Sequence, residues 1–374
     1  MKLHRTLHLP PHTNIVILLF GGILFFYALE ATADLLIPLA FAFVLSLFLY
    51  PLCQRIERYV GRGGAIALSL LLVGLSISLV LGLIYGNLLS FAADLPQMEQ
   101  RINTLINLAQ TVIEEKFQIS SESQVSWLQE NFKSFAASGG KLLNSTINSI
   151  TSFLTQLFLI PIYAFFMLLY RHVFQGFLNK ALDAAHQDRA MTIRQQVQNV
   201  IQKYIAGLFT VVSIVAVLNV VGLWAIGIKH ALFFGVLAAF LTIIPYIGIF
   251  IGSLLPIVYA LTMTDSLMYP LAVFIWFQVV QALEGNVITP NVVGSQVSIN
   301  PLVAMLALLI GGNVWGIAGM ILFVPFTAML KVALDNIPML APYGFLLGEG
   351  EAPQTEPTQP SFWQKIIFWK NKNT

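Results

Sequence analysis

Hydrophobic residues dominate this chain in long runs, which alternate with shorter polar stretches. A helix that crosses a membrane needs about 20 mainly apolar residues. By that measure, the pattern predicts an all-α polytopic membrane protein with about eight hydrophobic helical segments. The segments cover residues 14–33, 35–53, 64–90, 146–170, 204–228, 231–263, 267–283 and 301–331.

Two of these segments, 231–263 and 301–331, are too long for one ordinary span, and both are interrupted. Proline removes a backbone donor and glycine loosens a helix. Each segment is therefore predicted to be either a broken helix that crosses the membrane or a re-entrant helical hairpin. The two models place residues 284–300 on opposite faces of the membrane. The interrupting residues are Pro245, Gly248 and Pro256 in the first segment, and Gly311, Gly312, Gly316, Gly319 and Pro325 in the second.

Basic residues flank particular segments, and this sets the predicted orientation, because short loops rich in Lys and Arg stay cytoplasmic. The rule places both termini, the 54–63 loop and the 171–203 stretch inside the cell. Residues 91–145, where acidic residues outnumber basic ones, then lie outside. The start of the chain imitates a cleavable signal peptide, but its long apolar run and the spans that follow at once favour a retained first helix.

This pattern divides the chain into four parts. Residues 1–90 hold the first three transmembrane helices, and 91–145 form an extracytoplasmic helical hairpin with amphipathic stripes. Residues 146–338 form the main transport region, with 171–203 as a cytoplasmic connector. Residues 339–374 form a linker and an interfacial tail. The stripes of the hairpin either pack on each other, or lie on the membrane or join neighbouring subunits.

Composition supports the membrane class. Hydrophobic residues make up 57% of the 374 residues and charged residues 10%, and the mean hydropathy is +0.80. Soluble domains carry about 25% charged residues. The net charge is only +2 and no dense Lys/Arg run exists, so no nucleic-acid partner is expected. Cys53 is the only cysteine, which excludes an intrachain disulfide.

Signatures of enzymes and of metal sites are missing, so neither catalysis nor a cofactor is expected. The sequence has no His-Glu-x-x-His and no Gly-x-Ser-x-Gly motif. His4, His8 and His12 are spaced by four residues, but Pro10 and Pro11 interrupt any helix that could align them on a metal. Without a Walker motif, uphill work would draw on an ion gradient or on a partner.

One cluster of polar residues lies beside the broken segments. Gln278, Gln281 and Glu284 follow each other in steps of three, which places them on one helix face. An ionisable group at a membrane boundary is costly unless it meets water, a partner or a substrate. Glu284 is therefore predicted either to mark an aqueous route at a helix break or merely to cap or pair at the interface. Further polar candidates are Asn286, Thr289, Asn219 and Asn313.

Residues 283–334 resemble the C-terminal signature of the autoinducer-2 exporter family of permeases, the PerM-like group. Segments 240–252 (FLTIIPYIGIFIG) and 165–174 (FFMLLYRHVF) are similar to two further elements of that family. The chain departs from the pattern at Asn291, where a basic residue is usual, and at residues 298–300. The matching positions are Glu284, Pro290, Val292, Val293, Gly294, Asn300, Pro301, Leu302, Gly311 and Gly312.

The resemblance implies a permease of the bacterial inner membrane that exports a small signalling molecule, with possible exchange of sodium or protons and a homo-oligomeric state. Membrane lipid and a small-molecule or ion substrate are the other expected partners. In the leading hypothesis, segments 231–263 and 301–331 form a moving gate and Glu284 couples transport to a proton or cation. The alternative is a membrane scaffold or regulatory protein that transports nothing. The expected gate or hinge residues are Pro245, Gly248, Pro290, Gly294, Pro301, Gly311 and Gly312.

Overall fold

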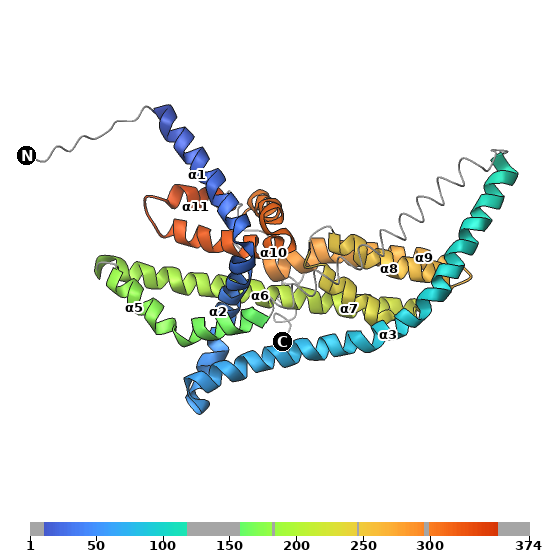
Figure 1. Cartoon of the computed structure of the whole chain (residues 1–374), viewed down its shortest axis with the longest axis horizontal. Coiled ribbons are helices and arrows are strands. Elements are labelled where there is room, and N and C mark those ends of the chain that lie inside the picture. The colour runs from blue at the N-terminus through green and yellow to red at the C-terminus, as the bar shows by residue number, and fades with distance from the viewer. Residues whose placement is uncertain (1–10, 118–157, 182–183, 245–246, 295–298, 351–374) are drawn as a thin grey trace, which may run out of the picture.

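The computed structural model describes residues 11–117, 158–181, 184–244, 247–294 and 299–350, and all regular elements in these ranges are helices (Figure 1). Five of the described helices are long and apolar enough to cross a membrane. The elements are α1 (Pro11–Ala31), α2 (Ala33–Val60), α3 (Arg62–Phe117), the helix Phe158–Leu169, α5 (Arg171–Ala181), α6 (Ala184–Ile226), α7 (Ala231–Leu241), α8 (Ile247–Met263), α9 (Met268–Leu283), the π-helices η1 (Glu284–Ile288) and η2 (Pro290–Gly294), α10 (Pro301–Asp335) and α11 (Ala341–Leu347).

The predicted fold class is confirmed, because each predicted hydrophobic segment is helical over most of its described length. Helix α3 joins two predicted elements, the span 64–90 and the amphipathic stripe 97–117, into one helix of 56 residues. Figure 1 shows α3 following one side of the molecule and then turning away from it. The second stripe of the 91–145 hairpin, the tail 351–374 and the first two histidines lie outside the described residues.

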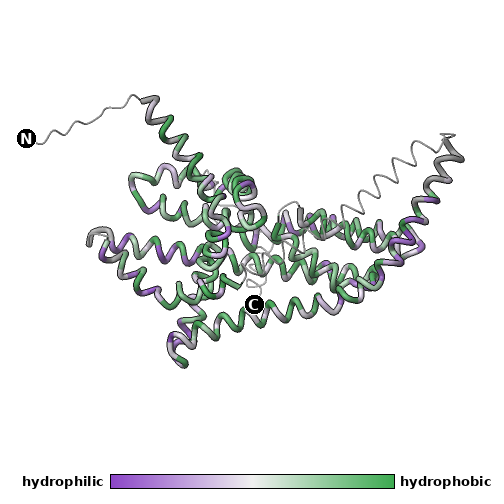
Figure 2. Tube along the Cα trace, in the orientation of Figure 1, coloured by the Kyte–Doolittle hydropathy of each residue, from purple (hydrophilic) through white to green (hydrophobic). Residues whose placement is uncertain are grey.

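Apolar residues cover most of the surface. Figure 2 shows hydrophobic positions along nearly the whole tube, with hydrophilic ones gathered mainly at α5, at the first turns of α6 and where α3 turns away. Many large apolar residues on α1 and on the first half of α3 are more than half exposed, for example Phe20 at 62% and Leu71 at 55%. A soluble protein rarely exposes large contiguous apolar areas, whereas lipid tails would cover such a surface.

Loops that were predicted to be cytoplasmic lie together at one end of the molecule. Arg171 at the start of α5 pairs with Glu57 near the end of α2. Asn336, after α10, donates to the Gln196 side chain of α6 at 2.7 Å. Arg62 at the start of α3 donates to the carbonyl of Leu168 at 3.0 Å. The 54–63 loop, the 171–203 stretch and the end of α10 therefore share one end, as the charge rule requires.

The other end, here named the Asp94 end, holds a second set of charged residues. Asp94 of α3 pairs with Lys229 and His230 of the α6–α7 loop. Arg101, further along α3, pairs with Asp265 of the α8–α9 loop. The chain therefore enters α7 and leaves α8 at the same end of the molecule.

Helices α7 and α8 form an antiparallel hairpin. A Cβ added at Gly252 would lie 3.0 Å from Ala238 Cα, and one added at Gly248 would overlap the carbonyl group of Leu241. The two arms are thus in backbone contact beside their connection at residues 242–246. Of the two models for segment 231–263, the structure shows the hairpin.

Helix α10 is also folded back on itself. Trp315 and Gly316 have non-helical backbone angles, and Gly316 has φ +58°, a conformation that favours glycine. A Cβ added at Gly311 would overlap the Gly319 carbonyl oxygen, so the arms touch on either side of the break. Segment 301–331 is therefore a second helical hairpin.

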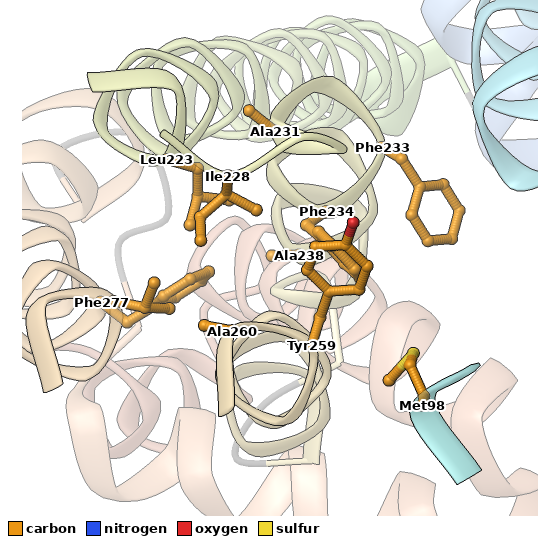
Figure 3. Packing of buried hydrophobic residues seen from close by; sticks show 11 residues of the cluster. Met98, Leu223, Ile228, Ala231, Phe233, Phe234, Ala238, Tyr259, Ala260 and Phe277 are labelled. Carbon is orange, nitrogen blue, oxygen red and sulfur yellow. The ribbon is translucent and has the colours of Figure 1, made fainter. Parts of the chain in front are cut away.

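The largest buried cluster joins the first hairpin to its neighbours. Figure 3 shows side chains from α3, α6, α7, α8 and α9 converging around Phe234 and Tyr259. Phe91 of α3 stacks on Phe233 at 5.4 Å between ring centroids and meets Phe234 edge-on at the same distance. The core thereby fixes the half of the hairpin at the Asp94 end. The connection between its arms lies beyond this cluster.

Candidate functional site

A small cavity lies where the connection of the first hairpin meets α6 and α9. Its volume is about 10 Å³, and a water molecule needs roughly 10–15 Å³ measured in this way. Four of the residues that line it are polar, although most of the surrounding helices are apolar. The lining residues are Val215, Asn219, Ala238, Thr242, Ile249, Phe277, Val280, Gln281 and Glu284.

Among the described residues that line this cavity, Glu284 contributes the only ionisable side chain. Its carboxylate accepts hydrogen bonds from Gln281 Nε2 at 3.1 Å and from the Thr289 hydroxyl. Thr289 lies five residues after Glu284, and its backbone N–H donates to the Glu284 carbonyl. This i to i+5 bonding defines a π-helix, and the wide turn brings the two side chains together.

The π-helix changes one expectation. The sequence predicted a segment that ends near residue 283, with Glu284 either marking an aqueous route at a helix break or capping or pairing at the interface. The end near residue 283 is wrong, because the chain continues as η1 and η2 to Gly294, with Thr289 between them also helical. The break that borders the cavity belongs to the first hairpin, at residues 242–246. Single π-helical turns are frequent at functional sites.

Asn219 reaches the cavity from α6. Its side chain is 2% exposed, and its Oδ1 is buried without a hydrogen-bond partner. An unsatisfied buried acceptor costs about 1–3 kcal/mol. The same atom is satisfied if a donor or a cation enters the cavity.

Thr242 closes the cavity at the end of α7. It is the residue that follows the last turn of the helix, and its hydroxyl donates to the Ala239 carbonyl at 2.6 Å. The C-terminal end of a helix carries a partial negative charge, since its last carbonyls lack intrahelical partners. The C-terminal end of helix α7 thus adds negative potential at the cavity that Glu284 also lines.

The polar side chains predicted as transport candidates divide into two groups. The structure brings Gln281 and Glu284 together at the cavity. By contrast, Gln278, Asn286 and Asn313 are exposed, and the latter two donate to backbone carbonyls four residues earlier, at 2.9 Å each. These three residues do not line the cavity, and their role in transport stays a prediction.

The predicted gate residues also differ in their roles. Gly248, Gly311 and Gly319 permit the backbone contacts within the hairpins, and Gly312 lies close to the Met320 side chain. Pro290 begins η2 and Gly294 ends it, whereas Pro301 is the first residue of α10. Asn300 caps that helix, because its side chain accepts the Val303 N–H at 2.9 Å. Pro245 lies outside the described residues.

The Asp94 cluster was not predicted from the sequence. Its members are Asp94, Lys229, His230 and Tyr259, and all three partners reach the same carboxylate. The distances to Asp94 Oδ2 are 2.8 Å from His230 Nε2, 3.1 Å from Lys229 Nζ and 3.1 Å from the Tyr259 hydroxyl. His230 is 3% exposed. The cluster fastens both arms of the first hairpin to α3.

Thr242 was missed as well, because a threonine in an apolar segment is an ordinary helix residue. Its only signal was its place beside the proline-glycine element of segment 240–252. Among the described residues, no three His, Cys, Asp or Glu side chains form a group that could hold a metal ion. The site is therefore one carboxylate surrounded by neutral oxygen and nitrogen groups.

Comparisons with known proteins agree with this architecture. Residues 14–339 match the family model described as AI-2E family transporter. The chain is 28% identical to a Haemophilus influenzae protein over 364 residues, 94% of this chain and 98% of the relative. It is 27% identical to YueF of Bacillus subtilis over 82% of this chain and 85% of the relative. Both relatives are named "putative transport protein". It is also 25% identical to the AI-2 transport protein TqsA of Escherichia coli, over 86% of this chain and 92% of that relative.

Proposed function

The chain belongs to the AI-2E transporter family, and on that premise we propose that it is a secondary transporter whose transport site includes the cavity beside Glu284. It is a multi-pass membrane protein of a bacterial transporter family rather than an enzyme. The observation that carries the proposal is a partly buried carboxylate at a polar cavity that borders a helix break. Irregular backbone at membrane depth is tolerated where it lines a water-filled cavity.

The depth of the cavity supports this role. Helix α7 has 11 residues, so its last turn lies about 17 Å from the Asp94 end at 1.5 Å per residue. The hydrocarbon core of a bilayer is about 30 Å thick. The cavity thus lies near the middle of such a layer, where transporters built on discontinuous helices bind their substrates.

We propose that the first hairpin is the moving part. Its outer half is held by the Asp94 cluster and by the aromatic residues around Phe234. Of its inner connection, Thr242 lines the cavity and Ile243 packs against the buried cluster that includes Val215 of α6 and Val280 of α9. Tilting of the hairpin about its outer end would open the cavity to one side of the membrane and then to the other.

The cargo that we propose is a small polar signalling molecule similar to autoinducer-2, because one relative is named an AI-2 transport protein. Coupling to a proton or a cation at Glu284 would supply the energy. The protein is expected in the bacterial inner membrane with both termini cytoplasmic, surrounded by lipid and assembled as a homo-oligomer.

A flux assay tests the proposal. The full chain is reconstituted in liposomes, and uptake of AI-2 is measured for wild type, Glu284→Gln and Glu99→Gln. Glu99 is an exposed acid on α3 and serves as the matched control. We expect flux in wild type and Glu99→Gln, and a loss of at least about tenfold in Glu284→Gln, which corresponds to about 1.4 kcal/mol in the barrier.

Two results would contradict the proposal. Unchanged flux in Glu284→Gln would remove this carboxylate from the mechanism. Absence of solute flux in the wild type, with correctly folded protein in the liposomes, would favour the scaffold hypothesis. Equal thermal unfolding midpoints for the three proteins would show that any loss of flux is not a loss of fold.

A further inference from the structure

We propose that Arg62 and Arg171 bind the phosphate of an anionic phospholipid, at the end of the molecule opposite the Asp94 end. The site lies where the turn between α2 and α3 meets the bend between the helix Phe158–Leu169 and α5. Neither arginine lines the cavity beside Glu284. The inference is therefore independent of the proposed transport.

Both guanidinium groups lie beside the same bend. Arg62 donates to the carbonyl of Leu168 at 3.0 Å, and Arg171 begins α5, where the chain bends by 55°. Arg171 donates to Glu57 of α2, and its Cζ lies 5.2 Å from the centre of the Tyr50 ring. The end of α2, the start of α3 and the bend thus bring two positive groups into one region.

The hydrogen bonding of both arginines is incomplete. Nε of Arg62 and Nη1 of Arg171 are buried without a hydrogen-bond partner. The side chain of Arg171 is only 12% exposed. A buried donor without a partner is costly, and the cost is greater on a charged group. A phosphate group bound by both arginines would offer several oxygen acceptors, and guanidinium groups pair with phosphate in a bidentate way.

The charge of this end favours an anion. Segments 54–63 and 168–181 carry five Arg or Lys side chains and one acidic side chain, that of Glu57. Glu57 pairs with Arg171, whereas Arg62 donates to a neutral carbonyl. The preference for basic residues in cytoplasmic loops explains their number, but it does not explain why Arg62 and Arg171 are partly buried. Buried charges are normally paired, so the excess positive charge indicates an anionic ligand.

Helix α5 indicates that this anion belongs to a lipid. Val173, Phe174 and Phe177 lie on one face of the helix and are 64%, 59% and 66% exposed. An apolar helix face beside basic residues is typical of a helix that lies in the membrane interface. Lipid tails would cover this face while the phosphate reaches Arg171, the first residue of the same helix. Basic pockets between membrane helices at the cytoplasmic side bind anionic headgroups in this way.

The first turn of α3 leaves room for a headgroup. Gly63 and Gly64 are exposed, and a Cβ added at Gly63 would meet no atom within 4 Å. The first N–H groups of a helix lack intrahelical partners and attract anions. They add backbone donors next to Arg62, which is the first residue of α3.

The test is lipid binding to the purified full chain in a neutral detergent, measured by native mass spectrometry with phosphatidylglycerol and phosphatidylcholine. Arg62→Gln and Arg171→Gln remove a charge but keep an amide donor. Arg58→Gln is the matched control, because Arg58 is an exposed arginine in the last turn of α2. The thermal unfolding midpoint of each protein is measured with either lipid, and with inorganic phosphate at the same ionic strength.

We expect wild type and Arg58→Gln to bind phosphatidylglycerol at least about tenfold more tightly than phosphatidylcholine. Phosphatidylglycerol should also raise their midpoints, because a ligand of the folded state stabilises it. In Arg62→Gln and Arg171→Gln this preference should fall at least about tenfold, since hydrogen bonds to charged groups are strong. Because Arg171→Gln leaves Glu57 without its partner, the double variant Glu57→Gln/Arg171→Gln is also measured and should show the same loss.

The inference is overturned if wild type shows no preference for phosphatidylglycerol, or if Arg58→Gln loses as much of it as the other arginine variants. Lower midpoints for Arg62→Gln and Arg171→Gln with an unchanged lipid preference would show a purely structural role for the arginines and would also refute the site. If inorganic phosphate raises the wild-type midpoint as much as phosphatidylglycerol does, the ligand is a free anion and the lipid site is refuted.

Discussion

The two helical hairpins of this protein have the same backbone plan but different surroundings. In both, glycines bring the arms into contact beside a helix break, at Gly248 and Gly252 in the α7–α8 hairpin and at Gly311 and Gly319 in α10. The break of the first hairpin borders a polar cavity. At the break of the second, the Trp315 indole donates to the Leu29 carbonyl of α1 at 2.9 Å, a contact that anchors the tip.

The comparison teaches that a broken helix is not by itself a transport site. Glycine and proline determine where the chain can reverse, and at the second break the structure shows a packing contact, from Trp315 to the Leu29 carbonyl. The first hairpin differs because α6 and α9 present Asn219, Gln281 and Glu284 to its break. Function is therefore inferred from the polar side chains contributed by neighbouring helices.

The largest effect on stability is expected at the glycine contact of the second hairpin. The change Gly319→Ala places a Cβ against the backbone of Gly311, where no flexible side chain can give way. Overpacking of this kind costs about 1–3 kcal/mol, and the upper value is expected here. The measurement is the thermal unfolding midpoint in detergent. Gly21→Ala, which meets nothing within 4 Å, is the control, and an equal midpoint for both variants would disprove the close contact.

The second largest effect on stability is expected at the Asp94 end of the first hairpin. Asp94→Asn weakens the hydrogen bonds from His230, Lys229 and Tyr259, and a hydrogen bond to a charged group is worth about 1.5–3 kcal/mol. We expect a loss of about 2 kcal/mol of unfolding free energy. Asp265→Asn is the control, because the side chain of Asp265 is 94% exposed and that of Asp94 is 15% exposed. Similar midpoints in the two variants would show that the Asp94 cluster does not hold the hairpin.

A smaller effect on stability is expected at the break of the second hairpin, beside Trp315. Trp315→Phe keeps the aromatic ring that meets Phe323 edge-on but removes the hydrogen bond to the Leu29 carbonyl. The expected cost is about 1 kcal/mol of stability, with solute flux retained. If flux falls by as much as in Glu284→Gln while the midpoint is unchanged, the second hairpin also takes part in transport and the contrast between the hairpins is lost.

The smallest effect is expected at Asn313, on the first arm of α10. Its side chain is exposed and donates to the Leu309 carbonyl of its own helix. Asn313→Ala should change stability by no more than about 0.5 kcal/mol and leave flux unchanged. A strong loss of flux would show that this residue, which the sequence also indicated, contacts the cargo.

The helices and the interruptions of both long segments could be predicted because their causes are local. Length and hydropathy define the spans, and glycines such as Gly248 and Gly311 within the apolar segments indicate where the helices are interrupted. Charge patterning also predicted which loops share an end, as the contact between Arg171 and Glu57 confirms. The choice between a crossing segment and a hairpin needed the structure, since both models agree with the charges.

The composition of the site could be predicted only in part. The step-of-three pattern found Gln281 and Glu284, but the same pattern included Gln278, which the π-helix and the packing of α9 leave exposed. Asn219 was a weak candidate because one polar residue in an apolar helix does not reveal its neighbours. Thr242 and Asp94 gain their roles from contacts between helices far apart in the sequence, and no local pattern encodes those contacts.

The central claim is that the break of the first hairpin is reached by water while that of the second is dry. Single cysteines at Thr242→Cys and Val314→Cys test it most directly, in a Cys53→Ala background that removes the only native cysteine. The rate of modification by 2-aminoethyl methanethiosulfonate is measured by intact mass spectrometry in liposomes. We predict rapid modification at position 242 and none at 314. Equal reactivity at both positions, or reactivity at 314 alone, would contradict the account.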